Sequence, residues 1–411
     1  MSIATSFDVV IAGAGPGGSA CAWVLAEAGL KVALVDKETF PRDKICGDAI
    51  SGKVLSLLFY MAPELLEELH QGDFLQPTHG IRFVAPNQVV LDIPLRANGE
   101  KVPPPAYVST RLDFDDFLFQ KAKARPEVHT YEGFRIKEVK QEGEKAWVSD
   151  GNQRLQAPIL VGADGAQSRV ARALAKQSVV PLHHSAGVRL YVEGVTGFHP
   201  DQYLELHYLK SLLPGYFWIF PLPNGRANVG LGMLTADLQK SPVNLREQLL
   251  SAITSHPQIA PRFAQARILD EVRGFGLPLG SLKRPISGER FLLVGDAAGL
   301  VDPFTGEGIG NAMISGRIAA QHILARWGKQ AFSADSLKAY DEAVFHKLGQ
   351  ELQLSHRLQQ LARRPWLFNW VTKRVSRSPS LQTLFTAMFD NIDLRSQLKN
   401  PRFYLKLLLG K

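Results

Sequence analysis

Cysteine is scarce in this chain, with two residues in 411, and no long apolar run compensates for it. Two cysteines cannot form a disulfide framework, which favours a reducing compartment such as the cytoplasm. No run of apolar residues approaches the roughly 18–20 that a membrane-spanning helix needs. The first apolar run begins within a few residues of Met1 and no basic segment precedes it, so we expect no signal peptide.

The chain also lacks the patterns of three other kinds of site. No Cys and His residues have metal-ligand spacing, so we expect no bound metal. No set of Ser, His and Asp indicates a nucleophilic triad. No nucleic-acid-reading motif accompanies the basic residues, so we expect no nucleic-acid partner.

The net charge of +8 is distributed unevenly along the chain. Residues 352–411 hold eleven Lys or Arg and two Asp, and the remainder is close to neutral. Aromatic residues lie beside the basic ones, as in Arg363-Arg364-Pro365-Trp366. Two interpretations remain open: a segment that holds the protein on the inner, anionic face of the membrane, and a basic helical cap over a substrate cavity.

The sequence does contain one clear pattern, a glycine-rich βαβ unit at residues 7–36. The apolar run at residues 9–12 predicts a strand buried on both faces. An Ala-rich helical segment follows and ends at Gly29, and a second apolar run at residues 32–35 leads into Asp36. Strand, glycines, helix, strand and acid together indicate a dinucleotide-binding unit.

Each glycine of this unit has a physical task. Gly13 permits a tight turn, Gly15 lets a pyrophosphate approach the backbone, and Gly18 lets the helix pack on the sheet. The helix N-terminus offers unpaired N–H groups to the phosphates, and Asp36 accepts hydrogen bonds from ribose hydroxyls. The residues expected to contact the dinucleotide here are Gly13, Gly15, Pro16, Gly18, Asp36 and Lys37.

Two later apolar runs also end in glycine and aspartate. Residues 159–161 lead into Asp164-Gly165, and residues 291–294 lead into Gly295-Asp296. We expect both strands to join the sheet of the first unit, which would bring their carboxyl ends to one edge.

Between these runs the pattern changes to short alternating strands. Residues 80–95 predict a hairpin with a turn at Pro86-Asn87, and residues 186–235 predict several more strands. We expect a large antiparallel sheet that is distinct from the parallel one. In strand geometry Tyr216, Trp218 and Phe220 project to one face, which suits either a hydrophobic core or the wall of an apolar cavity.

The predicted fold class is α/β (α+β overall), with a Rossmann-like dinucleotide-binding domain, an inserted antiparallel-sheet domain and a helical C-terminal segment. The predicted boundaries are residues 1–75, 107–178 and 276–330 for the first domain, 76–106 and 179–275 for the inserted substrate domain, and 331–411 for the basic helical region.

The three glycine and aspartate segments, in this order, resemble the three FAD motifs of p-hydroxybenzoate-hydroxylase-like flavoproteins. The resemblance extends from Asp8 to about Leu324 and implies that the dinucleotide is FAD. It implies that the Asp164 segment closes over the pyrophosphate, that Asp296 binds the ribityl chain, and that Arg111 lies near the flavin. It further implies cofactor contacts from Cys46, Gly47, Gly165, Gly295, Gly306, Gly308 and Ile309.

Finer features resemble the geranylgeranyl reductase group of this superfamily. They are residues 44–48 (KICGD), residues 216–221 (YFWIFP) followed by Gly230 and Gly232, and residues 303–309 (PFTGEGI). The resemblance implies reduction of isolated carbon–carbon double bonds in polyprenyl chains by reduced FAD. Such a double bond carries no polar group that a protein could bind. The binding free energy would therefore come from apolar contact, at about 25 cal/mol for each Å² buried.

The reduction also needs a proton donor near the alkene. Cys46, Tyr216 and a water molecule are the candidates, although a lone cysteine is commonly inert packing. The candidate catalytic residues are therefore Cys46, Tyr216 and Trp218, the last as part of the substrate cavity.

The electron donor is not decided by the sequence. No second G-x-G-x-x-G motif stands in a βαβ context, so NAD(P)H docking transiently, a protein carrier such as ferredoxin, or a quinol would each serve. A flavin monooxygenase or halogenase on the same scaffold is the main alternative, although halogenases typically show W-x-W-x-I-P where this chain has Tyr216 and Phe220. A non-catalytic flavin- or lipid-binding protein is a second alternative.

Overall fold

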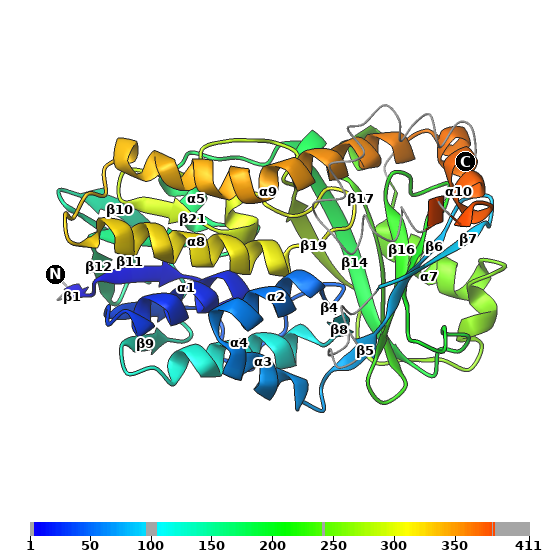
Figure 1. Cartoon of the computed structure of the whole chain (residues 1–411), viewed down its shortest axis with the longest axis horizontal. Helices are drawn as coiled ribbons and strands as arrows, with labels where there is room; N and C mark the ends of the chain where they lie inside the picture. The colour runs from blue at the N-terminus through cyan, green and yellow to red at the C-terminus, as the bar shows by residue number, and fades with distance from the viewer. Residues whose placement is uncertain (1–3, 96–104, 241–242, 380, 383–411) are drawn as a thin grey trace.

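The computed structural model describes residues 4–95, 105–240, 243–379 and 381–382. The molecule is elongated, with a helix-covered α/β half at one end and a half built around a large sheet at the other (Figure 1). The predicted α/β class with an inserted sheet is confirmed.

A six-stranded sheet forms the centre of the first half. Its strands in spatial order are β20 (Ser287–Gly288), β21 (Phe291–Leu293), β13 (Ile159–Gly162), β2 (Val9–Ala12), β3 (Val32–Val35) and β9 (Val128–Tyr131). All neighbours are parallel except β20 and β21. Because β21, β13 and β2 are adjacent and parallel, the three segments that follow them emerge at one edge of the sheet.

Helices pack on this sheet, and β11 (Lys145–Ser149) and β12 (Arg154–Ala157) of a smaller sheet contact its central strands β13 and β2. Helix α1 (Pro16–Glu27) packs against α8 (Ile309–Trp327) and α4 (Arg111–Lys123). The approach of α1 to α8 is close, because a Cβ on Gly316 would lie 2.2 Å from the carbonyl oxygen of Gly17. Glycine at this position therefore fixes how near the first βαβ unit lies to α8.

An eight-stranded sheet forms the second half. Its spatial order is β18 (Arg267–Ile268), β14 (His184–Glu193), β17 (Arg226–Leu234), β16 (Tyr216–Leu222), β15 (Leu204–His207), β6 (Gly80–Val84) and β7 (Val90–Pro94), with β19 (Arg273–Pro278) also paired to β14. The hairpin expected at residues 80–95 is present as β6 and β7. The sheet is not purely antiparallel, because the hairpin joins its edge through a parallel pair between β6 and β15.

The two faces of β16 have different partners. Phe217 and Ile219 pack in a cluster with α7 (Leu245–Ser255), whereas Trp218 and Phe220 belong to a cluster on the opposite face. The alternation expected for a strand is therefore present, and it separates a packed core from an aromatic face.

Smaller sheets complete the fold. One has the order β1 (Ala4–Ser6), β12 (Arg154–Ala157), β11 (Lys145–Ser149) and β10 (Glu138–Glu142); the other has the order β4 (Ala49–Ile50), β8 (Ala106–Val108) and β5 (Gln76–Thr78). Helices α2 (Gly52–Met61) and α3 (Pro63–His70) connect β4 to β5, whereas α5 (Arg169–Ala173) follows β13 and α6 (Thr235–Lys240) follows β17.

Helix α9 (Ala334–Ala362) runs along both halves of the molecule, and α10 (Pro365–Ser376) follows it beside β7 (Figure 1). The basic segment of residues 352–411 is thus mostly helical where it is described, and its residues 380 and 383–411 lie outside the described part. In the described ranges, no helix has both the length and the apolarity needed to span a bilayer. The domain boundaries given above stay a prediction.

Candidate functional site

A cavity of about 1700 Å³ is lined by residues of both halves. Every residue singled out from the sequence as a cofactor or catalytic candidate lines it, with the exception of Gly18. Gly18 instead lies beneath the turn, where an added Cβ would stand 1.9 Å from the carbonyl oxygen of Gly13. Its position agrees with a packing role more than with cofactor contact.

The first turn has the shape that a pyrophosphate needs. Gly13 has a φ of +103°, and a Cβ there would lie 2.2 Å from the carbonyl oxygen of Ala163. A Cβ on Gly15 would meet only the side chain of Arg42, at 3.5 Å. Gly15 is the N-cap of α1 and no side chain caps its N–H groups in the described structure. Open space, free N–H groups and the helix dipole thus meet at this point.

Asp36 is held in place by the backbone. Its Oδ2 accepts the Ala14 N–H at 2.9 Å, and its Oδ1 accepts the Glu38 N–H at 3.1 Å. Each carboxylate oxygen has a second lone pair, so both can still accept a hydroxyl proton. This arrangement fits the predicted contact with an adenosine ribose.

Asp164 is used largely within its own loop. It accepts hydrogen bonds from Ser168 Oγ at 2.5 Å, from Arg169 N at 2.6 Å and from Val170 N at 3.2 Å. These bonds tie the loop to the start of α5, and burial raises the pKa of the carboxyl. Asp164 therefore shapes the turn that brings the Gly165 backbone to the cavity.

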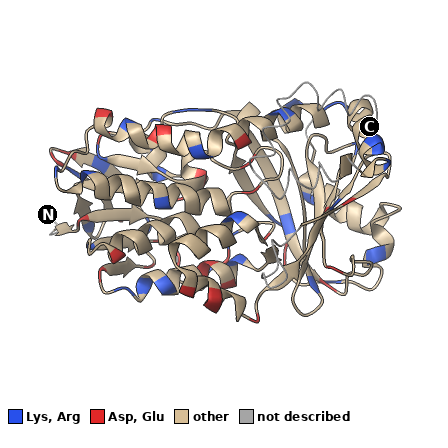
Figure 2. Cartoon of the chain, in the orientation of Figure 1, with Lys and Arg blue, Asp and Glu red and all other residues tan. Residues whose placement is uncertain are grey.

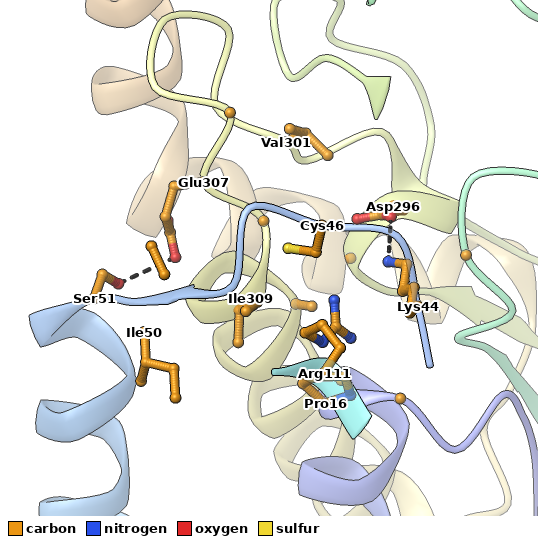
Figure 3. Close-up of a pocket in the computed structure, with 18 of the residues that line it drawn as sticks. Pro16, Lys44, Cys46, Ile50, Ser51, Arg111, Asp296, Val301, Glu307 and Ile309 are labelled. Atoms are coloured by element: carbon orange, nitrogen blue, oxygen red, sulfur yellow. Dashed lines mark hydrogen bonds and ion pairs between the residues drawn. The ribbon is translucent and has the colours of Figure 1, made fainter. Parts of the chain in front are cut away.

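The flavin end of the cavity gathers residues from four distant segments. Figure 3 shows Cys46, Arg111 and Ile309 around one space, with the Lys44–Asp296 pair on one side and the Ser51–Glu307 pair on the other. The Lys44 ammonium donates to Asp296 Oδ2 at 2.8 Å. The loop of residues 44–48 is thus tied to Asp296, the residue expected to hold the ribityl chain.

Arg111 is buried and fully paired with Asp115 on the same helix. Its Nε lies 2.5 Å from Asp115 Oδ1 and its Nη2 lies 2.7 Å from Oδ2, while Arg42 Nη1 lies 2.7 Å from the same Oδ2. Burial would raise the pKa of Asp115, but the two guanidinium groups outweigh burial and lower it. The Cys46 thiol is within hydrogen-bonding reach of Arg111.

Sequence reasoning missed Asp115 and Arg42. The spacing of four residues between Arg111 and Asp115 on a helix was a usable signal for their pairing. No comparable signal existed for Arg42.

The N-terminus of α8 carries a carboxylate. Glu307 Oε1 accepts the Gly310 N–H at 2.8 Å and the Ser51 hydroxyl at 3.2 Å. Glu307 therefore offsets part of the positive charge of this helix end, and Lys53, 3.3 Å from its Oε2, places a cation beside it.

The aromatic face of β16 is a cavity wall. Tyr216, Trp218 and Phe220 all line the cavity, and the Tyr216 hydroxyl donates to the Thr305 carbonyl oxygen at 2.5 Å. Two glycines give the wall room: a Cβ on Gly47 would lie 3.0 Å from the Phe220 ring, and one on Gly230 would lie 2.2 Å from Trp218. Of the two interpretations of this face, the structure supports the cavity wall.

A buried polar network is bonded to this wall through Trp218. Asn228 Oδ1 accepts the Trp218 indole N–H at 2.8 Å, and Asn228 Nδ2 donates to Asp48 Oδ2 at 2.8 Å and to the Cys46 carbonyl oxygen at 2.7 Å. The Tyr191 hydroxyl also donates to Asp48 Oδ2, at 2.7 Å. Asp48 stands within the segment compared above, yet nothing in the sequence indicated a role for it.

In the part of the chain that the structure describes, no three His, Cys, Asp or Glu side chains are grouped to hold a metal ion. The prediction that the protein binds none stays a prediction.

The comparison with protein families gives one match that covers most of the chain: the family described as FAD binding domain matches residues 6–346. Menaquinone reductase of Mycobacterium tuberculosis (strain H37Rv) is 30% identical over 409 residues, which cover 95% of this chain and 93% of that protein. Digeranylgeranylglycerophospholipid reductase 2 of Methanopyrus kandleri is 31% identical over 364 residues, which cover 84% and 83%.

Solved structures share the fold. A geranylgeranyl bacteriochlorophyll reductase-like protein of Thermoplasma acidophilum superposes with a TM-score of 0.79 at 22% identity, covering 97% of this chain and all of that one. The halogenase PltM, solved with phloroglucinol and FAD, superposes with a TM-score of 0.74 at 18% identity, covering 96% of this chain and 84% of that one. At such identities these two likenesses establish the fold alone.

The turn at Gly13–Gly15, the oriented Asp36 carboxylate and the cavity size fit FAD, as the sequence predicted. The resemblance to flavoproteins is likewise confirmed by the matched family and by the reductase relatives. The chain therefore belongs to the FAD-binding-domain family and is an FAD-dependent oxidoreductase similar to geranylgeranyl and menaquinone reductases.

Proposed function

We propose that this oxidoreductase reduces isolated carbon–carbon double bonds of a polyprenyl or similar long apolar chain. The observation that carries the proposal is the position of the β16 aromatic face: Tyr216, Trp218 and Phe220 line the same cavity as Cys46 and Arg111. An apolar wall thus adjoins the region expected for the flavin. Relatives whose names include menaquinone and digeranylgeranylglycerophospholipid reductase support the same substrate class.

Bound FAD, once reduced, supplies a hydride. The chain's own residues bind and orient the substrate, and its apolar side chains stabilise the complex by about 25 cal/mol for each Å² they cover. Tyr216 is fixed by its bond to Thr305, so it serves as an oriented wall; its one proton is engaged and burial raises its pKa. Trp218 is fixed in the same way by Asn228.

The test is a product analysis. Protein loaded with FAD is reduced under anaerobic conditions and mixed with menaquinone or with a digeranylgeranyl lipid, and mass spectrometry follows the addition of hydrogen. We expect one pair of hydrogen atoms for each bond reduced, with reoxidation of the flavin. Reduced protein that leaves every polyprenyl alkene unchanged contradicts the proposal.

The same reduced protein tests the monooxygenase and halogenase alternative. A C4a-hydroperoxide that accumulates on mixing with oxygen, followed by hydroxylation or halogenation of an aromatic compound, would favour that alternative. A protein that binds FAD and lipid but shows neither reaction would be a non-catalytic binder.

We further propose a peripheral position on the cytoplasmic face of a membrane. On α10, Trp366 is 68% and Trp370 is 37% exposed, and Lys373 and Arg374 lie in the last turn of the same helix. Figure 2 shows basic residues in blue at this end of the molecule. Exposed indoles beside cations suit an anionic lipid surface. The electron donor would be NAD(P)H, a carrier protein such as ferredoxin, or a quinol, and anaerobic reduction by each donor in turn distinguishes them.

A further inference from the structure

Asp48 is a wholly buried carboxyl group that lines the cavity. It ends the loop of residues 44–48, and its φ of +69° lies in the left-handed region that only glycine, asparagine and aspartate tolerate well. A position that needs such a backbone is most easily filled by glycine. The chain instead places an acid there, with no exposed surface and among the residues that line the cavity.

The two oxygens of Asp48 have different surroundings. Oδ2 accepts the Tyr191 hydroxyl at 2.7 Å and the Asn228 amide at 2.8 Å. Oδ1 is buried and has no hydrogen-bond partner among the described residues. Because both donors occupy Oδ2, a proton on this carboxyl group belongs on Oδ1, where it has no acceptor within the protein.

The charged and titratable groups that face Asp48 come from three elements. Arg189 and Tyr191 lie on β14, Arg111 lies on α4, and Cys46 lies on the same loop. The Arg189 guanidinium donates hydrogen bonds to two other carboxylates, Asp43 Oδ2 and Asp270 Oδ2, each at 2.5 Å. Burial outweighs the hydrogen bonds from Tyr191 and Asn228 and the two guanidinium groups, and it raises the pKa of Asp48 to about 7.

The network connects this carboxyl group to both sides of the reaction space. Asn228 binds Asp48 through its Nδ2, which also reaches the carbonyl oxygen of Cys46, and it holds Trp218 through its Oδ1. Asp48 is therefore fixed relative to the flavin loop and to the substrate wall. No other described carboxyl group that lines the cavity combines full burial with an oxygen lacking a partner.

We propose that Asp48 is the general acid that protonates the alkene, an inference that rests on the proposed reduction of a carbon–carbon double bond. The hydride of reduced FAD forms one new C–H bond, and the π electron pair of the alkene forms the second with the proton of Asp48 Oδ1. The flavin is thereby oxidised and Asp48 becomes a carboxylate. Solvent returns a proton to Asp48 before the next turnover. This role replaces Cys46, Tyr216 and water as the candidates for the donor.

The first test follows flavin reoxidation after pre-reduced, FAD-loaded protein is mixed anaerobically with a polyprenyl substrate over a pH series. The wild-type rate should fall as pH rises through about 7, because only the protonated acid reacts. Asp48→Asn keeps the shape and the tolerance of positive φ, and it should lower the rate about 100- to 10,000-fold and abolish that pH dependence. Flavin content and circular dichroism verify that the variant is folded and loaded.

A second variant leaves the acid in place. Tyr191→Phe removes one hydrogen bond that favours the carboxylate, so the pH midpoint should move upward while the low-pH rate is retained. The matched control is Glu205→Gln. Glu205 is a buried carboxylate in the same eight-stranded sheet as Tyr191, and it does not line the cavity. Its pH midpoint should equal that of the wild type.

An infrared difference spectrum between pH 6 and pH 8 provides a readout that does not depend on turnover. The FAD-loaded wild type should lose the carbonyl band of a protonated carboxylic acid across this range, and Asp48→Asn should lack the band. If alkene reduction persists in Asp48→Asn at the wild-type rate, or if the band is absent from the wild type, Asp48 is not the acid and the proposed function stands. If the wild type reduces no alkene although the band titrates, the proposed function fails, and the general-acid role fails with it.

Discussion

Lys53 Nζ lies 2.6 Å from Glu351 Oε1, although 298 residues separate the two in the chain. The same ammonium lies 3.1 Å from Asn311 Oδ1 and 3.3 Å from Glu307 Oε2. Helix α2, the start of α8 and helix α9 therefore converge on a single cation. The long C-terminal helix is in this way attached to the loop that borders the flavin end of the cavity.

We expect Lys53→Met to lower the free energy of unfolding by about 3–5 kcal/mol, because it removes the cation that binds the buried Glu351 and the half-buried Glu307. Burial would lower the pKa of Lys53, but Glu307 and Glu351 outweigh it and raise the pKa. Lys140→Met is the control, since Lys140 and Glu138 form an exposed pair worth under about 1 kcal/mol. Chemical denaturation measures both. Equal losses in the two variants would contradict a structural role for Lys53.

Substitutions at the second and third glycines of the first turn, Gly15 and Gly18, should have different effects. Gly15→Ala places a methyl group in open cavity space, so the protein should fold normally but bind FAD at least about tenfold more weakly, a loss of about 1.4 kcal/mol. Gly18→Ala forces a Cβ to 1.9 Å from the Gly13 carbonyl oxygen, so it should lower stability itself. Thermal unfolding of the FAD-free proteins and fluorescence titration with FAD separate the two effects. A Gly15→Ala protein with normal FAD affinity would place the pyrophosphate elsewhere.

Gly230→Ala should disturb the substrate wall and leave the cofactor bound. Its Cβ would lie 2.2 Å from Trp218 and 2.4 Å from the Val188 carbonyl oxygen, so the indole has to move. We expect a rise in KM or a fall in kcat of about tenfold or more with unchanged FAD content, in line with the sensitivity of rate to small displacements. Gly232→Ala is the matched control, because its Cβ would find the Ala186 carbonyl oxygen at 3.5 Å. Steady-state kinetics of both variants on one polyprenyl substrate measures the difference.

Glu205 should stabilise the protein at neutral pH and lose this contribution in acid. Burial would raise its pKa, but the hydrogen bond to His207 and the Arg262 guanidinium lower it below the usual value. Its contribution is therefore present above the ordinary glutamate pKa of about 4.3 and is lost as pH falls through the lower, folded-state value. Glu205→Gln should destabilise the protein at neutral pH and flatten the loss of stability below about pH 4.3. Unchanged acid denaturation in this variant would contradict the ion pair's contribution.

The membrane proposal predicts a specific loss of lipid binding. Trp366→Ser combined with Trp370→Ser should reduce sedimentation with anionic vesicles severalfold and leave activity on a detergent-solubilised substrate unchanged. Val179→Ser, which also removes an exposed apolar side chain, is the control. Binding that is indifferent to both tryptophans and to deletion of residues 352–411 would favour the alternative of a basic cap.

The sequence predicted the cofactor end of this molecule well. A βαβ unit can be recognised from a short stretch of sequence, because the strand, the turn glycines and the acid lie within thirty residues. Backbone sterics determine the geometry of that stretch. Asp164-Gly165 and Gly295-Asp296 could be added because parallel strands deliver their following loops to one edge. The sequence did not indicate which groups two of the carboxylates bind: Asp164 accepts the Arg169 N–H at the start of α5, and Glu307 accepts the Gly310 N–H at the start of α8.

The sequence by itself determined the dinucleotide turn, the two kinds of sheet and the apolar side of β16, since each depends on neighbours a few residues apart. Only the tertiary structure decided that this side faces a cavity, that Lys53 joins α2 to α9, and that Asp48 is buried between Tyr191 and Asn228. The reason is that burial and charge pairing are set by residues distant in the chain: Asn228 and Asp48 are 180 positions apart. The affinity of a carboxyl group for its proton depends on those neighbours and not on its place in a motif.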